Sequence, residues 1–146
     1  MRIERSRVLA TTRERIWDVV GDPWHEPRWW PRVQRVEGVT RRGWTSVMIS
    51  RRGNTVRADY TVEASERPHR RRWRQELEGT AFERIFTAYA VEVALERVEA
   101  GTAVRLLVDQ QPRGMARLMP WTLRRAMRRQ LDTALDNLAA VVEDAP

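Results

Sequence analysis

Residues 119–142 read MPWTLRRAMRRQLDTALDNLAAVV, and their pattern settles the architecture of the chain. Large apolar side chains recur there at steps of three and four over about six turns, which predicts a long α-helix with one buried face. The members of this series are Met119, Leu123, Met127, Leu131, Leu135, Leu138 and Val142. Arginines crowd the first half of the helix and acids follow, an order that opposes the helix dipole. Packing against another part of the chain must therefore hold the helix in place.

The surface that covers this helix is predicted between residues 33 and 111, where the apolar period changes to two. Residues 55–64 place Tyr60 on an apolar face, and residues 73–77 place Trp73, Gln75 and Leu77 on another. Glycine and proline turn signals divide the region into six strands. A sheet with one polar and one apolar face is typically antiparallel, and the helix supplies its apolar cover.

The N-terminal residues add a further strand and two short helices. Residues 2–10 predict the strand, and Thr11 with Glu14 has the spacing of a capping box for a first helix. Gly21-Asp22-Pro23 ends that helix, and a second helix is predicted over residues 24–30. No linker or repeat interrupts the sequence, so we expect a single α+β domain over residues 1–146.

Several stretches resemble the START-like (SRPBCC) superfamily, which includes polyketide cyclase/dehydrases and lipid-transfer domains. Residues 16–23, IWDVVGDP, with Trp30-Pro31, resemble its opening helix pair, residues 101–104 resemble the turn before its last strand, and residues 134–138, ALDNL, resemble its closing helix. The resemblance covers the whole chain and implies the helix-grip fold, a seven-stranded curved antiparallel sheet with two short helices and one long C-terminal helix around a pocket for an apolar molecule. These motifs are structural, so they imply the fold and not a reaction.

Composition excludes several classes of protein. The absence of cysteine rules out disulfides, thiol nucleophiles and cysteine-bound zinc, and the sequence contains no phosphate loop or dinucleotide fingerprint. We expect no cofactor, no metal site and no assignable catalytic residue. His25-Glu26, the one histidine beside a carboxylate, could flank the pocket mouth as an acid/base pair, but an exposed surface pair is the favoured interpretation. No apolar run could span a bilayer and no signal peptide is recognisable, so we expect a cytoplasmic protein without stable membrane insertion.

All 27 basic side chains are arginine, and the formal net charge is +7. They are spread along the chain and interleaved with acids, which favours a solvated surface over a site for nucleic acid. The same interpretation is given to the four arginines of the long helix, Arg124, Arg125, Arg128 and Arg129.

Candidate ligand-binding residues are bulky or polar side chains on the predicted inward faces. Tyrosine and glutamine there could orient a ligand carbonyl or phenol, while tryptophan and methionine could contact its apolar body. The predicted set is Trp30, Met48, Tyr60, Trp73, Gln75, Tyr89, Met119 and Trp121. Core packing is an equal alternative for the tryptophans, and mutual hydrogen bonding or an ordered water is an equal alternative for the tyrosines and Gln75, whereas methionine at helical spacing more often belongs to the core.

Three functions are compatible with these observations. The first is binding of a hydrophobic small molecule such as a lipid, a polyketide or an aromatic metabolite. The second is an enzyme of the polyketide cyclase, aromatase or dehydratase type. The third and least favoured is an arginine-rich binder of nucleic acid or of a membrane surface. Either a monomer or a homodimer is compatible with the sequence, which does not identify the ligand.

Overall fold

The computed structural model describes residues 1–143, and it confirms the predicted order of elements. Seven strands, three α-helices and three short 3-10 helices follow one another along this part of the chain. They are β1 (Arg2–Leu9), α1 (Arg13–Val20), η1 (Pro23–His25), α2 (Glu26–Trp29), β2 (Val33–Glu37), β3 (Gly43–Ile49), β4 (Thr55–Glu66), β5 (Arg70–Glu76), η2 (Ala81–Arg84), β6 (Phe86–Val98), β7 (Gly101–Pro112), η3 (Gly114–Leu118) and α3 (Pro120–Glu143).

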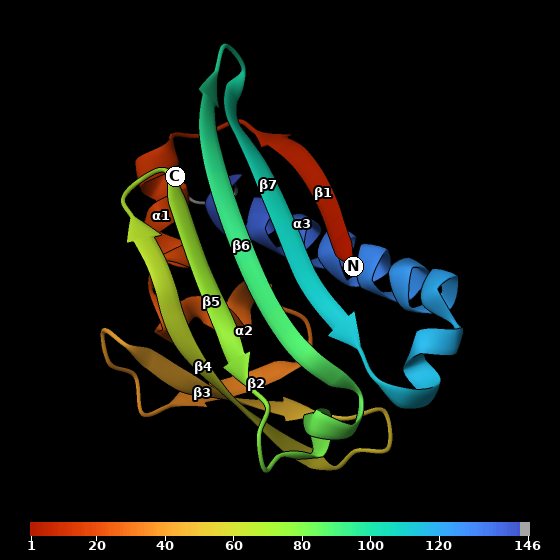
Figure 1. Cartoon of the computed structure of the whole chain (residues 1–146). Helices are drawn as coiled ribbons and strands as arrows, with labels where there is room; N and C mark the ends of the chain where they lie inside the picture. The colour runs from red at the N-terminus through yellow and green to blue at the C-terminus, as the bar shows by residue number, and fades with distance from the viewer. Residues whose placement is uncertain (144–146) are drawn as a thin grey trace.

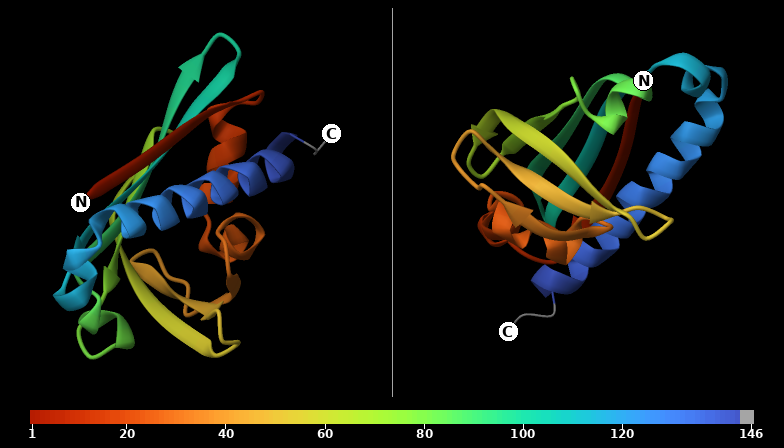
Figure 2. Two further views of the ribbon diagram at one scale, coloured as in Figure 1. Left: turned by 90° about the vertical axis from the view of Figure 1, so that its right-hand side faces the viewer. Right: turned by 90° about the horizontal axis from the view of Figure 1, so that it is seen from below.

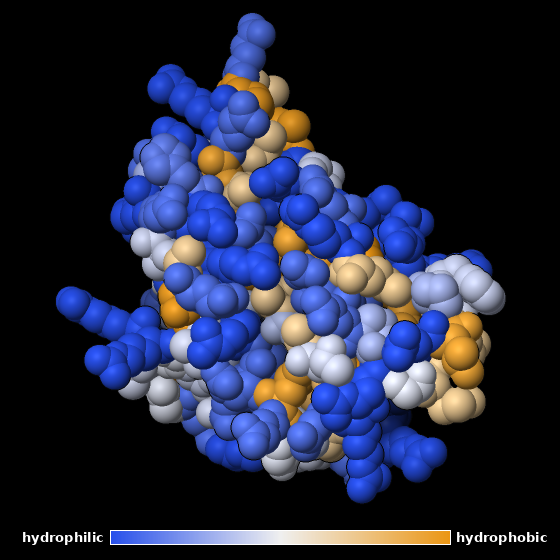
Figure 3. Space-filling view, in the orientation of Figure 1, coloured by the Kyte–Doolittle hydropathy of each residue, from blue (hydrophilic) through white to orange (hydrophobic). Residues whose placement is uncertain are grey.

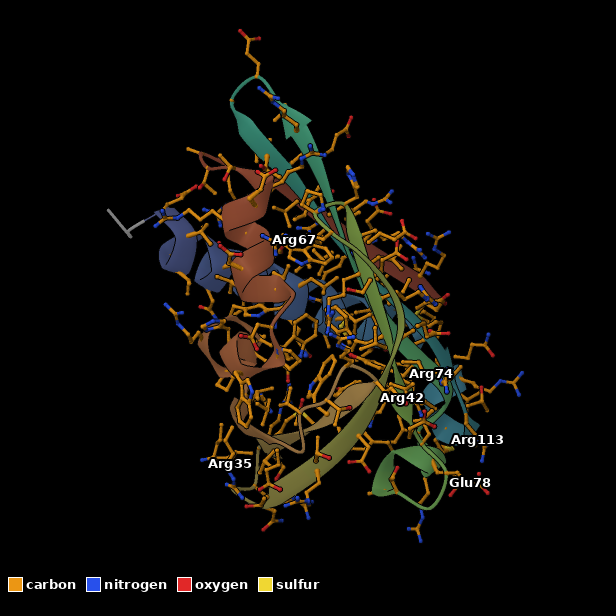
Figure 4. All side chains as sticks on the ribbon, turned by 90° about the vertical axis from the view of Figure 1, so that its left-hand side faces the viewer. Arg35, Arg42, Arg67, Arg74, Glu78 and Arg113 are labelled. Atoms are coloured by element: carbon orange, nitrogen blue, oxygen red, sulfur yellow. The ribbon has the colours of Figure 1, made fainter. Side chains whose placement is uncertain are left out.

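The seven strands form one antiparallel sheet in the order β1-β7-β6-β5-β4-β3-β2. The sheet is rolled into a trough, and α3 lies along its open side (Figures 1 and 2). Charged side chains project outward around the ribbon (Figure 4). This arrangement is the predicted helix-grip fold, in which the concave face of the sheet is mostly apolar and buried and the convex face is mostly polar and exposed.

Helix α3 is buried through the apolar series that predicted it, from Met127 onward. Its buried members include Leu131 and Leu138, which are fully enclosed. Asn137 donates from Nδ2 to the carbonyl oxygen of Trp29 at 3.2 Å and so ties α3 to α2. Exposed ion pairs to β1, such as Arg5 with Asp132 at 2.8 Å, add little because solvent screens them. Within residues 1–143, no helix has the length and apolar character needed to cross a bilayer.

The predicted capping box at the start of α1 is wrong by one residue. Thr12, not Thr11, is the N-cap, and its hydroxyl accepts from the backbone N–H of Arg15 at 3.2 Å. Thr11 is engaged elsewhere, because its carbonyl oxygen accepts from the hydroxyl of Thr102 at 2.8 Å. With two adjacent threonines, spacing alone does not show which hydroxyl caps the helix.

Candidate functional site

A pocket of about 400 Å³ lies between the concave face of the sheet and α3. Helix α3 contributes Met127 and Gln130 to its wall, and the segment around η2 contributes Phe82, Ile85 and Phe86. The remaining wall comes from strands β3 to β6 and from the residues that follow α2. The pocket is partly open to solvent, so it is less enclosed than the resemblance implied.

Five of the eight candidate residues come together in this pocket. They are Trp30, Met48, Tyr60, Gln75 and Tyr89. Four of these come from neighbouring strands and one from the end of the helix pair, so residues far apart in sequence share one wall.

The other three candidates lie outside the pocket lining. Trp73 is 3% exposed and packs against Trp44 with ring centroids 5.7 Å apart, because the inward face of β5 continues into the core beyond the pocket. Met119 and Trp121 are 52% and 70% exposed. The start of α3 projects past the edge of the sheet, so its first turn has no strand to pack against (Figure 1).

Alternation over residues 85–93 predicts that Ile85, Thr87, Tyr89, Val91 and Val93 share one inward face, and this prediction is wrong at its start. Tyr89, Val91 and Val93 are buried as predicted, whereas Ile85 and Thr87 are exposed. The strand pairing shifts register between Phe86 and Ala88, and this bulge interrupts the alternation, so Thr87 is exposed while Phe86 lines the pocket with Tyr89. Phe82, Ile85 and Phe86 were missed as pocket residues, although their spacing of three and four indicates the helical turn that the structure contains at η2.

One row of side chains crosses the concave face from β3 to β7. Trp44 lies opposite Tyr60, and Tyr60 lies opposite Gln75. The β5–β6 register brings Gln75 beside Tyr89, which lies opposite Gln110. All five side chains are buried, and the middle three line the pocket. We call these five residues the cross-sheet row.

Two amide atoms of the cross-sheet row have no hydrogen-bond partner within residues 1–143. These are Nε2 of Gln75 and Oε1 of Gln110. A buried polar group without a partner costs on the order of 1–3 kcal/mol, so each of these atoms lowers the stability of the protein when no ligand is bound. Gln75 differs from Gln110 in lining the pocket, and rotation of its amide would present either a donor or an acceptor there.

Behind the row lies a buried carboxyl, which the sequence did not reveal. Glu26, at the start of α2, is 5% exposed and accepts a hydrogen bond from the hydroxyl of Ser46. That hydroxyl in turn accepts from Nε1 of Trp44 at 3.1 Å. Burial raises the pKa of Glu26 to about 7, against the opposing effect of the hydrogen bonds. The interpretation of His25-Glu26 as an exposed pair is wrong for Glu26, because the single turn of α2 points this residue at the sheet.

The charge of Glu26 affects two tyrosines of the pocket wall, Tyr60 and Tyr89. Burial raises the pKa of Tyr60 and Tyr89, and the charge of Glu26 raises it further in both. Both phenols therefore stay neutral at ordinary pH and can donate or accept a hydrogen bond. Arg71, buried on the same face of β5, lies over the ring of Trp44 at 5.8 Å and donates to Ser65 at 3.0 Å. The pocket thus combines a mostly apolar wall with neutral polar groups and one arginine, Arg32.

The sequence matches the family model for polyketide cyclase / dehydrase and lipid transport over residues 1–143. No curated protein matches it as a relative. A similar solved structure is a protein from Thermus thermophilus, with 20% identity, a TM-score of 0.76 and coverage of 99% of this chain and 98% of that one.

Two further similar structures are di-domain ARO/CYC proteins from biosynthetic pathways. BexL, from the BE-7585A biosynthetic pathway, has a TM-score of 0.80 at 12% identity, with 100% of this chain and 51% of that chain covered. StfQ, from the steffimycin biosynthetic pathway, has a TM-score of 0.78 at 12% identity, with 98% and 50% covered. Such low identities show a common fold alone. On the family match over nearly its whole length, this chain belongs to the polyketide cyclase/dehydrase and lipid-transport family.

Proposed function

We propose that this protein binds a mostly apolar small molecule carrying one polar group, in the pocket between the sheet and α3. The observation that carries the proposal is Nε2 of Gln75, which has no hydrogen-bond partner among residues 1–143 and lies on a wall that is otherwise largely apolar. The pocket volume of about 400 Å³ also falls within the range of roughly 300–1,000 Å³ that is typical of small-molecule sites.

The lining favours a defined orientation of the ligand. Its apolar body would contact Met48, Phe82, Phe86 and Met127, whose side chains offer aromatic and adaptable surfaces. Its carbonyl or hydroxyl group would face Gln75 between the two tyrosines of the row. A lipid, a polyketide or an aromatic metabolite has this combination of groups.

Native mass spectrometry of the purified protein, followed by titration with the recovered compound or with anilinonaphthalene sulfonate, tests the proposal. Ala81 is an exposed residue of the lining, so Ala81→Trp should obstruct the pocket and weaken binding without disturbing the core. Ala100→Trp, at the exposed β6–β7 turn, is the matched control and should bind normally. Equal binding by both variants would place the ligand somewhere else.

Proton transfer on a reactive polyketone is a second candidate function, and Glu26 favours it. A carboxyl with a pKa of about 7 can release or take up a proton near neutral pH, and its charge acts on both tyrosines of the pocket wall. Glu26→Gln should then slow cyclisation of a synthetic poly-β-ketone and leave ligand affinity unchanged. A wild-type rate equal to that in buffer would reject the enzymatic function.

A further inference from the structure

The chain contains a long stretch with arginines and no acidic residue. Between Asp109 and Asp132 there are six arginines, and none forms an ion pair with any residue from 1 to 143. They are Arg113, Arg117, Arg124, Arg125, Arg128 and Arg129. Elsewhere many arginines face acids on the sheet, as Arg72 faces Glu63 at 3.3 Å. The positive charge of this stretch is therefore locally uncompensated.

The same stretch exposes large apolar side chains. Met115, Leu118, Met119 and Trp121 are 79%, 66%, 52% and 70% exposed. Hydrophobic side chains are visible at the right-hand edge of Figure 3, where Figure 1 places η3 and the start of α3. Scattered apolar residues on a surface are ordinary, but four within seven positions concentrate exposed apolar surface on one short segment, which indicates an interaction site. We call these four residues and the six arginines the η3–α3 patch.

The two kinds of side chain are mixed on one surface. Arg125 and Arg128 follow Trp121 at spacings of four and seven, which places all three on one face of α3. The buried face of the helix begins with Met127 and Leu131, so the face that carries Arg125 and Arg128 is exposed to solvent. Tryptophan beside arginine on an exposed helix matches the interface of a bilayer, where the ring lies among headgroups and the guanidinium meets lipid phosphate.

Position links the η3–α3 patch to the pocket. The backbone N–H of Arg113 donates to the carbonyl oxygen of Ile85 at 2.7 Å, and Ile85 lines the pocket. Figure 4 shows Arg113 beside this segment. Helix α3 itself carries Trp121 in the patch and Met127 in the pocket wall. A surface that holds the patch would therefore lie close to the pocket.

We propose that the η3–α3 patch docks this protein reversibly on an anionic lipid bilayer. Arginine phosphate contacts alone would also suit nucleic acid, but nucleic-acid backbone offers no place for Met115, Leu118 and Met119, whereas the acyl boundary of a bilayer does. The docking is peripheral, since the apolar residues occupy barely two turns of chain.

Vesicle sedimentation of the full chain tests this proposal. The wild type should bind vesicles of mixed phosphatidylglycerol and phosphatidylcholine, bind vesicles of phosphatidylcholine alone much more weakly, and lose binding as salt is added. Arg125→Gln with Arg128→Gln should lower the partition coefficient roughly 25-fold, since one arginine near an anionic surface contributes about fivefold. Met119→Ser with Trp121→Ser should lower it about tenfold or more through lost apolar contact.

Matched controls show whether vesicle binding depends on the η3–α3 patch itself or on any exposed tryptophan and any two arginines. Trp24→Ser removes a tryptophan that is 61% exposed in η1, and Arg41→Gln with Arg42→Gln removes two charges from the β2–β3 turn on the opposite side of the molecule (Figure 1). Both controls should bind vesicles like the wild type. Circular dichroism confirms that each variant is folded. Equal losses in patch and control variants, or binding of an oligonucleotide without binding of vesicles, would overturn the proposal.

Discussion

Replacement of Gln75 by leucine should change stability and affinity in opposite directions. Nε2 of Gln75 is buried and finds no partner in the described part of the chain, residues 1–143, and leucine keeps the bulk of the side chain while it removes this donor. The free energy of unfolding should therefore rise by about 1–3 kcal/mol, the cost of leaving such a group unpaired. Ligand affinity should fall by about 1–2 kcal/mol, roughly 5- to 30-fold, because one buried hydrogen bond to the ligand is lost.

Gln110→Leu is the control that separates these two effects. Gln110 is also buried on the cross-sheet row, and its Oε1 has no partner among the residues that the structure describes, but Gln110 does not line the pocket. Its replacement removes the unpartnered Oε1 but also the contact of Nε2 with Sδ of Met1 at 3.8 Å, so stability should rise by less than in Gln75→Leu, and affinity should stay unchanged. Urea unfolding measures the first quantity, and titration with the ligand recovered from the protein, or with anilinonaphthalene sulfonate, measures the second.

Two results would refute the reasoning about Gln75. If the folded Gln75→Leu protein binds as tightly as the wild type, Gln75 does not contact the ligand. If both glutamine variants lose affinity equally, the effect passes through the sheet as a whole and not through a contact in the pocket.

Three further predictions concern the surroundings of the site. Burial raises the pKa of Glu26 from 4.5 to about 7, so the folded state binds more protons than the unfolded state between these two pH values. The free energy of unfolding should therefore fall by about 3 kcal/mol across that pH window and level off above it. Glu26→Gln should abolish this pH dependence in urea unfolding. Trp73→Ala should cost about 3–5 kcal/mol of stability by calorimetry, since it removes the packing against Trp44, and a cost under about 1 kcal/mol would contradict that packing. Thr12→Ala should cost about 1 kcal/mol through loss of the α1 cap, whereas a similar cost for Thr11→Ala would contradict the assignment of the cap.

Much of the fold follows from two periods that are visible in the sequence. Alternation placed Tyr60 and Gln75 on one inward face, and hairpin connections then brought them opposite each other. The pairing itself depends on turn geometry and strand register, which periodicity does not contain. The bulge between Phe86 and Ala88 shows the limit, because it breaks the alternation that placed Thr87 on the inward face of Tyr89.

Periodicity also does not show how far along the helix the covering sheet extends. Met119 belongs to the same apolar series as Met127, yet the sheet ends before it reaches Met119. Glu26 was missed for a related reason, since a single helical turn has too few residues to show which side faces inward. Its burial becomes visible only when β3 supplies Ser46 as a partner.

The cross-sheet row has a consequence for how this pocket could change during evolution. Each of its five side chains comes from a different strand, and the strands are held together by backbone hydrogen bonds that do not depend on side-chain identity. A substitution at Tyr60, Gln75 or Tyr89 therefore alters one polar group at one known depth along the pocket wall without moving its neighbours. A lineage could exchange one ligand for another by single steps, each strand varying separately, while the curved trough around α3 stays as it is.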